Sequence, residues 1–409
     1  MDPAQMETLD ATDPLAKYRQ AFSLPEGVTY CDGMSLGALP KSTASRIAKV
    51  VTQEWGDGLI RSWNSAGWIQ SPQRLGGKLA PIIGANEDEV VVGDSTSVNL
   101  FKLLVAAIRL RPGRQTILME SSNFPTDIYV ARGVERLHPG TKVKLVGAGD
   151  LDAAFDEDVA VALLTHIDYK TSEMHDMKAV TARAHQVGSL VLWDLSHSTG
   201  AVPLHLNESK ADMAVGCGYK YLNGGPGAPA FLFVARRHLH ATEQPITAWI
   251  GHDKPFDFSI DYVPAAGVTR LLSGTPTILS MSALESGLDL WSGVDVSQVR
   301  KKSLRLSELF LRIVEHRLGT SEVKLLSPRD PNRRGSHLAF QHPRGYEVVQ
   351  ALIDQGVIGD FRDPDVMRFG FAPLYLRYVD VWRAATALVE VLQSRTWDQP
   401  RYRQRAVVT

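Results

Sequence analysis

The stretch LVLWDLSHS, residues 190–198, decides the fold of this chain. Its first four residues form a continuous apolar run that is too short for a helix and is typical of a strand buried on both faces. The run leads directly into Asp194, with His197 close behind. Open α/β sheets bind ligands at the carboxyl ends of their strands, and a buried carboxylate there needs a cationic partner or hydrogen-bond donors. The stretch therefore predicts such a sheet, with a ligand site at Asp194.

Further apolar runs extend the sheet on both sides of this strand. Between about residues 88 and 235 they alternate with helical patterns, which is typical of a mainly parallel sheet covered on both faces. The predicted strands lie at residues 90–92, 116–119, 143–146, 159–164, 190–193, 213–215 and 230–234. We therefore predict an α/β fold whose large domain contains a mainly parallel seven-stranded sheet.

A second unit is expected because 409 residues exceed what one compact core usually fills. After an irregular stretch at 250–276, an amphipathic run at 296–318 should open a smaller C-terminal α/β unit. We expect an N-terminal segment at 1–60 that packs with the small domain, a large domain at 61–290 and a small domain at 291–409.

The second informative stretch is GCGYKYLNGGPG, residues 216–227, which places Lys220 between two tyrosines and a glycine-rich turn. Alone the pattern is weak, because most lysines beside such turns are simply solvated. Together with Asp194 it becomes specific. Pyridoxal phosphate enzymes pair a lysine on the cofactor aldehyde with an acid on the protonated ring nitrogen. The two stretches therefore indicate a Schiff-base lysine at 220.

Charge and composition exclude several classes of partner. The formal net charge is -1, so the chain has no overall field for nucleic acid or an anionic membrane. No apolar run approaches the ~18 residues of a membrane span, and the first residues lack a signal-peptide pattern, so we expect a cytosolic protein. The two cysteines, Cys31 and Cys217, have no metal-site spacing and cannot form a disulfide framework. We expect no bound metal.

Three other groups of residues are candidates for the site. Thr96 and Ser97 follow a predicted strand and open a helix, where hydroxyls and free N–H groups can bind a phosphate; the alternative is an ordinary helix cap. Phe124 and Asp127 follow the strand that ends at Glu120, and could stack on a ring and support it; the alternatives are core packing and a helix cap.

Arg368 lies in the strand-like run VMRFGF, residues 366–371. Met367, Phe369 and Phe371 share one face, and Arg368 shares the other with a glycine, so the arginine face stays roomy. An arginine there could grip a substrate carboxylate with two parallel hydrogen bonds, or else form a surface ion pair.

These stretches resemble, in kind and order, the kynureninase family of pyridoxal phosphate enzymes, which have the aspartate aminotransferase fold (fold type I). The resemblance spans nearly the whole chain. It includes YCDGMSLG at 30–37, DSTSVNL at 94–100, FPTD at 124–127, WDLSHS at 193–198 and GYKYLNGGPG at 218–227. One departure is Met34, where the family commonly has asparagine.

The resemblance implies a role for each site residue. Lys220 would hold the cofactor and move protons at the substrate Cα, helped by Tyr219, and Asp194 would keep the pyridine nitrogen protonated. The phosphate end would be contacted by Thr96, Ser97, Tyr219 and Trp249, and the cofactor shell completed by Thr165, His197 and Thr275. Phe124 would stack on the ring, with Asp127 in the same pocket. Arg368 would hold the amino acid carboxylate.

The implied reaction is hydrolysis of L-kynurenine to anthranilate and L-alanine in tryptophan catabolism, catalysed by a homodimer with its active site at the subunit interface. The eukaryotic family members tend to carry asparagine where this chain has Thr275, which suggests a preference for kynurenine over 3-hydroxykynurenine.

Other functions remain alternatives. A cysteine desulfurase of the same fold type needs a nucleophilic cysteine in the C-terminal half, and no cysteine follows Cys217. A transcriptional regulator with an aminotransferase-like domain needs a DNA-binding segment, for which the short acidic N-terminus leaves no room. Another fold type I lyase, or a catalytically silent binding protein, is also conceivable, although the presence of both Lys220 and Asp194 argues against a silent protein.

Overall fold

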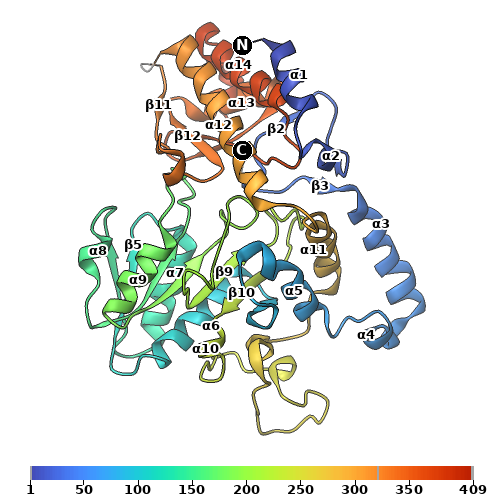
Figure 1. Ribbon diagram of the computed structural model, residues 1–409, viewed down its shortest axis with the longest axis vertical. Helices are drawn as coiled ribbons and strands as arrows, with labels where there is room; N and C mark the ends of the chain where they lie inside the picture. The colour runs from blue at the N-terminus through green and yellow to red at the C-terminus, as the bar shows by residue number, and fades with distance from the viewer. Residues whose placement is uncertain (1, 320–321, 407–409) are drawn as a thin grey trace.

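The computed structural model describes residues 2–319 and 322–406 and consists of two units stacked along the long axis (Figure 1). The larger unit is built on a seven-stranded sheet in the order β4-β10-β9-β8-β7-β5-β6. Its strands are β4 (Val90–Val92), β5 (Thr116–Glu120), β6 (Lys142–Val146), β7 (Val159–Thr165), β8 (Leu190–Asp194), β9 (Met213–Cys217) and β10 (Ala230–Val234). Strands β5, β6, β7, β8 and β9 are mutually parallel, whereas β10 is antiparallel to both of its neighbours, β4 and β9. The predicted fold class and all seven predicted strands are confirmed.

Strand β8 is buried on both faces, as its apolar run predicts. Leu190 and Leu192 pack in the same apolar cluster as Leu103 of the helix α6 (Thr96–Arg109). Val191 and Trp193 pack in a second cluster with Ala184 of the helix α9 (Met177–Gln186). Side chains alternate between the two faces of a strand, so helices cover the sheet on both sides. The helices of this unit are α4 (Ser62–Ser65), α5 (Ser71–Ile83), α6 (Thr96–Arg109), α7 (Pro125–Leu137), α8 (Leu151–Ala154), α9 (Met177–Gln186), α10 (Arg236–Leu239) and α11 (Ile278–Leu290).

The smaller unit contains an antiparallel sheet in the order β11-β12-β15-β14, covered by helices. Phe310 lies 4.9 Å from Phe369, ring to ring, and packs with Met367 and Phe371 as well, so the bulky face of β15 forms the core as predicted. The helix predicted at 296–318 is confirmed at both ends. The elements are α12 (Val296–Leu318), β11 (Lys324–Leu325), β12 (His337–Gln341), α13 (Gly345–Asp354), β13 (Val357–Ile358), β14 (Asp360–Arg362), β15 (Val366–Gly370) and α14 (Tyr378–Ser394).

The N-terminal chain runs from the smaller unit to the larger one. Helix α1 (Pro3–Ala11) packs on α14, and β2 (Thr29–Tyr30) pairs with β13. Helix α3 (Lys41–Lys49) then packs on α11 and continues into a π-helical segment, η1 (Val50–Asp57). The remaining elements here are α2 (Ala16–Arg19), β1 (Phe22–Ser23) and β3 (Leu39–Pro40). The domain boundaries at 60 and 290 stay a prediction.

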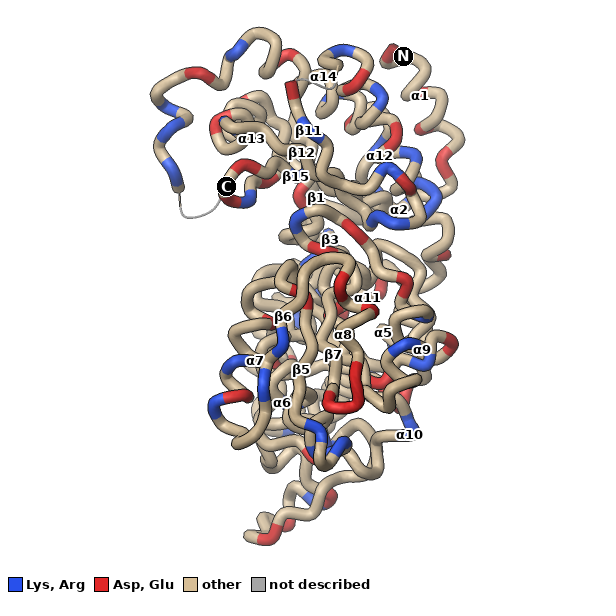
Figure 2. The backbone as a smooth tube through the Cα atoms, turned by 90° about the vertical axis from the view of Figure 1, so that its left-hand side faces the viewer, with Lys and Arg blue, Asp and Glu red and all other residues tan. Residues whose placement is uncertain are grey.

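Residues 250–276 are irregular, as expected, apart from short 3₁₀ turns. The 3₁₀ turns of the chain are η2 (Leu59–Arg61), η3 (Glu87–Glu89), η4 (Trp249–Gly251), η5 (Gly267–Leu271), η6 (Pro331–Arg333) and η7 (Pro400–Arg403). Basic and acidic residues are interspersed over both units (Figure 2). Among the described helices, none has the length and apolar character required to cross a membrane.

Candidate active site

Three polar side chains meet at the carboxyl ends of neighbouring strands of the large sheet. Asp194 ends β8 and lies opposite Thr165, which ends β7. Thr165 Oγ1 donates a hydrogen bond of 3.4 Å to Asp127 Oδ2, at the start of α7. Asp194 Oδ1 accepts a hydrogen bond of 2.8 Å from the Ser196 backbone N–H. All three side chains are buried. The strand pairing and the hydrogen bond thus bring together residues that lie far apart in the sequence.

The two carboxylates make this end of the site strongly favourable for a cation. Burial raises the pKa of Asp127 well above its ordinary value, and the charge of Asp194 raises it further. The Thr165 hydrogen bond and the charge of Lys220 act in the opposite direction, with smaller effect. A protonated ring nitrogen would offset this negative charge and donate its N–H to a carboxylate oxygen, so these acceptors fit a pyridine ring held in its cationic form.

Lys220 lies in the turn after β9, beside the ring of His197. Its Nζ is 2.9 Å from His197 Nε2 and 5.7 Å from the centre of the Tyr219 ring. Burial lowers the pKa of His197 well below its ordinary value, and the charge of Lys220 lowers it further. His197 is therefore neutral at physiological pH, and its Nε2 can accept a hydrogen bond from the lysine. His337, which the sequence analysis missed, lies 5.8 Å from His197, ring to ring.

The N-terminal DGMSLG stretch, residues 32–37, packs against the backbone of the turn that carries Lys220. The Gly37 N–H donates a hydrogen bond of 2.8 Å to the Tyr219 carbonyl. A Cβ at position 37 would lie 2.2 Å from the Lys220 carbonyl oxygen, so only glycine fits. Met34 is fully buried against Gly370, on the face of β15 that carries Arg368. The expectation that this face stays roomy is therefore wrong, because the methionine side chain fills the space beside the glycine.

Thr96 and Ser97 open α6 directly after β4. Ser95 is the N-cap residue, and its side chain accepts a hydrogen bond of 3.3 Å from the Val98 N–H. The capping role therefore belongs to Ser95, which leaves the hydroxyls of Thr96 and Ser97 and other first-turn N–H groups available for an anion.

The remaining candidates for the cofactor lie in loops. Phe124 is 41% exposed and has an edge-to-face contact of 5.1 Å with Tyr169, so one face of its ring is open for stacking. Trp249 is half-buried, 5.8 Å from Phe256, ring to ring, and Thr275 is exposed. In the described part of the chain neither Trp249 nor Thr275 hydrogen-bonds to Lys220 or Asp194, so their assignment stays a prediction.

Arg368 is buried on β15, and its partners were not predicted from the sequence. Asp360 lies directly opposite on β14, and its carboxylate pairs with the Nε and Nη2 edge of the guanidinium, with Nε 2.7 Å from Oδ1. Nη2 also donates to Ser35 Oγ at 3.1 Å, and Nη1 donates to the Tyr169 carbonyl. The edge best suited to two parallel bonds with a substrate carboxylate is thus already bound within the protein.

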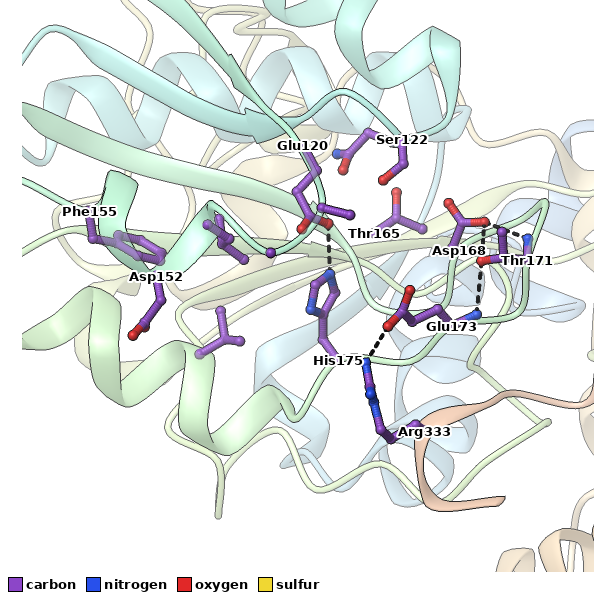
Figure 3. Close-up of a pocket in the computed structure, with 15 residues that line it drawn as sticks. Glu120, Ser122, Asp152, Phe155, Thr165, Asp168, Thr171, Glu173, His175 and Arg333 are labelled. Carbon is purple, nitrogen blue, oxygen red and sulfur yellow. Dashed lines mark hydrogen bonds and ion pairs between the residues drawn. The ribbon is translucent and has the colours of Figure 1, made fainter. Parts of the chain in front are cut away.

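A separate pocket of about 370 Å³ adjoins the site at Thr165 (Figure 3). His175 Nε2 lies 2.8 Å from Glu120 Oε2 on one wall, and Arg333 pairs with Glu173 at 2.5 Å on another. Neither Lys220 nor Asp194 lines this pocket. Of the candidate site residues, only Thr165 lines it.

Comparison with known proteins identifies the family of this chain. A family model described as the kynureninase C-terminal domain matches residues 299–388. A kynureninase of Burkholderia mallei is 51% identical over 407 residues, covering 98% of both chains, and one of Pseudomonas fluorescens is 50% identical over the same length. The chain belongs to the kynureninase family.

The fold of this kynureninase family member is shared with more distant enzymes. A cysteine desulfurase of Thermococcus onnurineus superposes with a TM-score of 0.77 over 92% of this chain and 98% of its own, at 18% identity. A variant of the lyase C-DES, with glycine covalently linked to its PLP cofactor, gives a TM-score of 0.75 over 91% of this chain and 99% of its own, also at 18% identity. At this identity the likeness shows the fold alone.

Proposed function

We propose that this chain binds pyridoxal 5'-phosphate on Lys220 and hydrolyses L-kynurenine to anthranilate and L-alanine. Family membership over 98% of the chain supports the reaction. The observation that carries the proposal is the meeting of Lys220, beside neutral His197, with the buried pair Asp194 and Asp127 at one sheet edge.

The residues present fit the cofactor. Thr96 and Ser97 would hold its phosphate at the first turn of α6, and Asp194 would hold the ring nitrogen in its protonated form. Phe124 would stack on the ring. When bound, the cofactor supplies an electron sink for the carbanion at the substrate Cα and for cleavage of the Cβ–Cγ bond.

The proton transfers fall to Lys220 and Tyr219. Lys220 takes and returns the proton at the substrate Cα. His197 beside it stays neutral, so it does not compete with Arg368 for the substrate carboxylate. The neighbouring Cys217, together with burial, raises the pKa of Tyr219 above its ordinary value. Tyr219 therefore keeps its proton at physiological pH and acts as a donor when water adds to the side-chain carbonyl.

Arg368 is proposed to bind the substrate carboxylate. Its positive charge and its position in the same neighbourhood as His197 support this role, because the charge of Arg368 contributes to the low pKa of His197. One N–H on Nη1 remains for a ligand, since Asp360 and Ser35 occupy Nε and Nη2 and the Tyr169 carbonyl accepts the other Nη1 hydrogen.

We further propose a cytoplasmic homodimer in which a second copy completes the site. Large apolar side chains are exposed at Trp55, Leu59 and Ile60, and again at Phe256 and Phe258. Clustered exposure of large apolar side chains is typical of an interaction site. A hollow lined by Trp55, Trp68 and Pro276 adjoins Thr275, so a partner seated there lies close to the proposed cofactor shell.

A panel of three substrates tests the function. The purified protein with pyridoxal phosphate should release fluorescent anthranilate from kynurenine, with a higher kcat/KM than for 3-hydroxykynurenine because of Thr275. It should release no sulfide from L-cysteine, because Cys31 and Cys217 are both buried and no cysteine follows them. Sulfide release without anthranilate would replace the proposal with a desulfurase.

A further inference from the structure

The buried arginine of the substrate site has few donors to spare. A guanidinium carries five N–H bonds. Arg368 directs Nε and Nη2 at Asp360, Nη2 also at Ser35 and Nη1 at the Tyr169 carbonyl, and its side chain is 1% exposed. Only one N–H, on Nη1, therefore lacks an acceptor in the described part of the chain. A carboxylate with two oxygens needs a further donor.

A second arginine, two strand positions beyond Asp360, lies in the same cluster. Arg362 Nη2 is 2.8 Å from Asp360 Oδ2 and 3.3 Å from Ser35 Oγ, the two groups that also hold Arg368. Nη1 donates to the Phe361 carbonyl at 2.9 Å. The Arg362 side chain is 34% exposed, and Nε and one Nη1 N–H have no acceptor among residues 2–319 and 322–406. Arg362 thus has both the free donors and the access that Arg368 lacks.

The charges of the cluster leave room for one anion. Burial opposes ionisation of Asp360, but Arg368 and Arg362 outweigh it and hold the pKa of Asp360 below its ordinary value. Burial and the charge of Asp360 raise the pKa of the adjacent Asp32 to about 8, so Asp32 is mainly protonated at neutral pH. Two arginines and one ionised aspartate leave a single positive charge, which one carboxylate would neutralise.

The cluster lies beside the reacting amine. The charges of both Arg362 and Arg368 contribute to the low pKa of His197, whose ring touches Lys220. Both arginines also interact with Tyr169, which packs on Phe124. A carboxylate held here therefore belongs to the molecule whose amino group reaches Lys220.

We propose that Arg362 is the second arm of the substrate carboxylate site, binding one carboxylate oxygen of the α-amino acid while Arg368 binds the other. The proposal rests on the proposed function, in which Arg368 serves this carboxylate. Asp360 and Ser35 are positioning residues that hold the two guanidinium groups side by side.

Arg362→Gln tests this assignment in the holoenzyme. The KM for kynurenine should rise at least about tenfold, with kcat changed less than threefold. The reason is that the lost contact stabilises the bound substrate and the transition state equally. L-Alanine and its neutral isostere L-alaninamide provide the second readout, as competitive inhibitors. Arg362→Gln should weaken inhibition by alanine about as much as it raises KM and leave alaninamide unchanged.

Arg405→Gln is the matched control. Arg405 lies over the Phe361 ring at 5.4 Å and pairs with Asp363 at 2.6 Å. It thus contacts β14 through Phe361, whose side chain points to the face opposite Asp360 and Arg362. This control should keep the KM and both inhibition constants of the parent enzyme. A KM for Arg362→Gln within twofold of the parent, or equal weakening of alanine and alaninamide, would overturn the proposal.

A second variant covers the case in which Arg362→Gln does not fold. Arg362→Lys keeps the charge but loses the planar fork, and it should discriminate between alanine and alaninamide less well than the parent enzyme. Unchanged discrimination together with an unchanged KM would count against the assignment. Failure of the proposed function itself is distinct, because the parent enzyme would then release no anthranilate.

Discussion

Asp32 is a buried carboxylate whose protonation should couple the stability of the fold to pH. Burial and the charge of Asp360 raise its pKa to about 8, far above its value in an unfolded chain. The folded state thus binds this proton more tightly than the unfolded state. The contribution to stability is complete below the unfolded pKa of about 4 and is lost as pH rises through 8.

Asp32→Asn should remove this pH dependence. The variant should melt at a higher temperature than the parent at pH 8.5, because it buries no charge, and the difference should shrink towards pH 5. Scanning calorimetry across this range measures it, with the exposed Glu157→Gln as control. A difference in melting temperature that is the same at pH 5 and 8.5 would contradict the assigned pKa.

The predicted site residues that the structure brings together are those carried by short continuous stretches. Asp194 and Lys220 lie at strand ends, and the carboxyl ends of parallel strands necessarily meet at one edge. Asp360 and Arg362 were missed, because their proximity to Arg368 depends on the β14–β15 register, which no local pattern specifies. His337 was missed for the same reason, since it reaches His197 from the smaller unit.

At the scale of elements, the turn that carries Lys220 depends on the glycine stretch beneath it. Gly37→Ala would place a Cβ 2.2 Å from the Lys220 carbonyl and 2.6 Å from Asn223 Nδ2. Overpacking of this kind costs about 1–3 kcal/mol, so cofactor affinity should fall roughly 5- to 150-fold if that cost falls on the bound state. Absorbance titration of the apoprotein with pyridoxal phosphate measures it.

Gly133→Ala serves as the comparison for that variant. A Cβ at position 133 in α7 meets nothing nearer than Arg136 Nη2, at 3.9 Å, so cofactor affinity should be unchanged. Equal affinities for the two variants would mean that the close approach of Gly37 does not position the lysine.

Sequence patterns predicted the elements of the sheet but not all their directions. Apolar runs mark where strands are, and the run itself is the same whichever way the strand points. The antiparallel β10 follows β9 without an intervening helix, and a parallel pair would need a longer crossover connection. The π-helical segment Val50–Asp57 was also missed, because its residues show no pattern distinct from an α-helix.

At the scale of the whole molecule, the exposed apolar surface around Ile60 should hold a second copy. Ile60→Asp should raise the dimer dissociation constant at least about tenfold and lower specific activity at low protein concentration. Sedimentation velocity over a dilution series measures the first effect. Leu137→Asp is the control, since Leu137 is 74% exposed against 77% for Ile60 but lies on α7, outside this surface. Equal dissociation of both variants would place the interface elsewhere.

The central claim is that Lys220 carries the cofactor opposite Asp194. The holoenzyme should be reduced with borohydride, which fixes the cofactor to its lysine, and then digested for peptide mass spectrometry. We predict the pyridoxyl label on Lys220 in the parent enzyme, and no label, no cofactor absorbance and no anthranilate release in Lys220→Ala. A label on any other lysine of the parent enzyme, or anthranilate release by Lys220→Ala, would contradict the account.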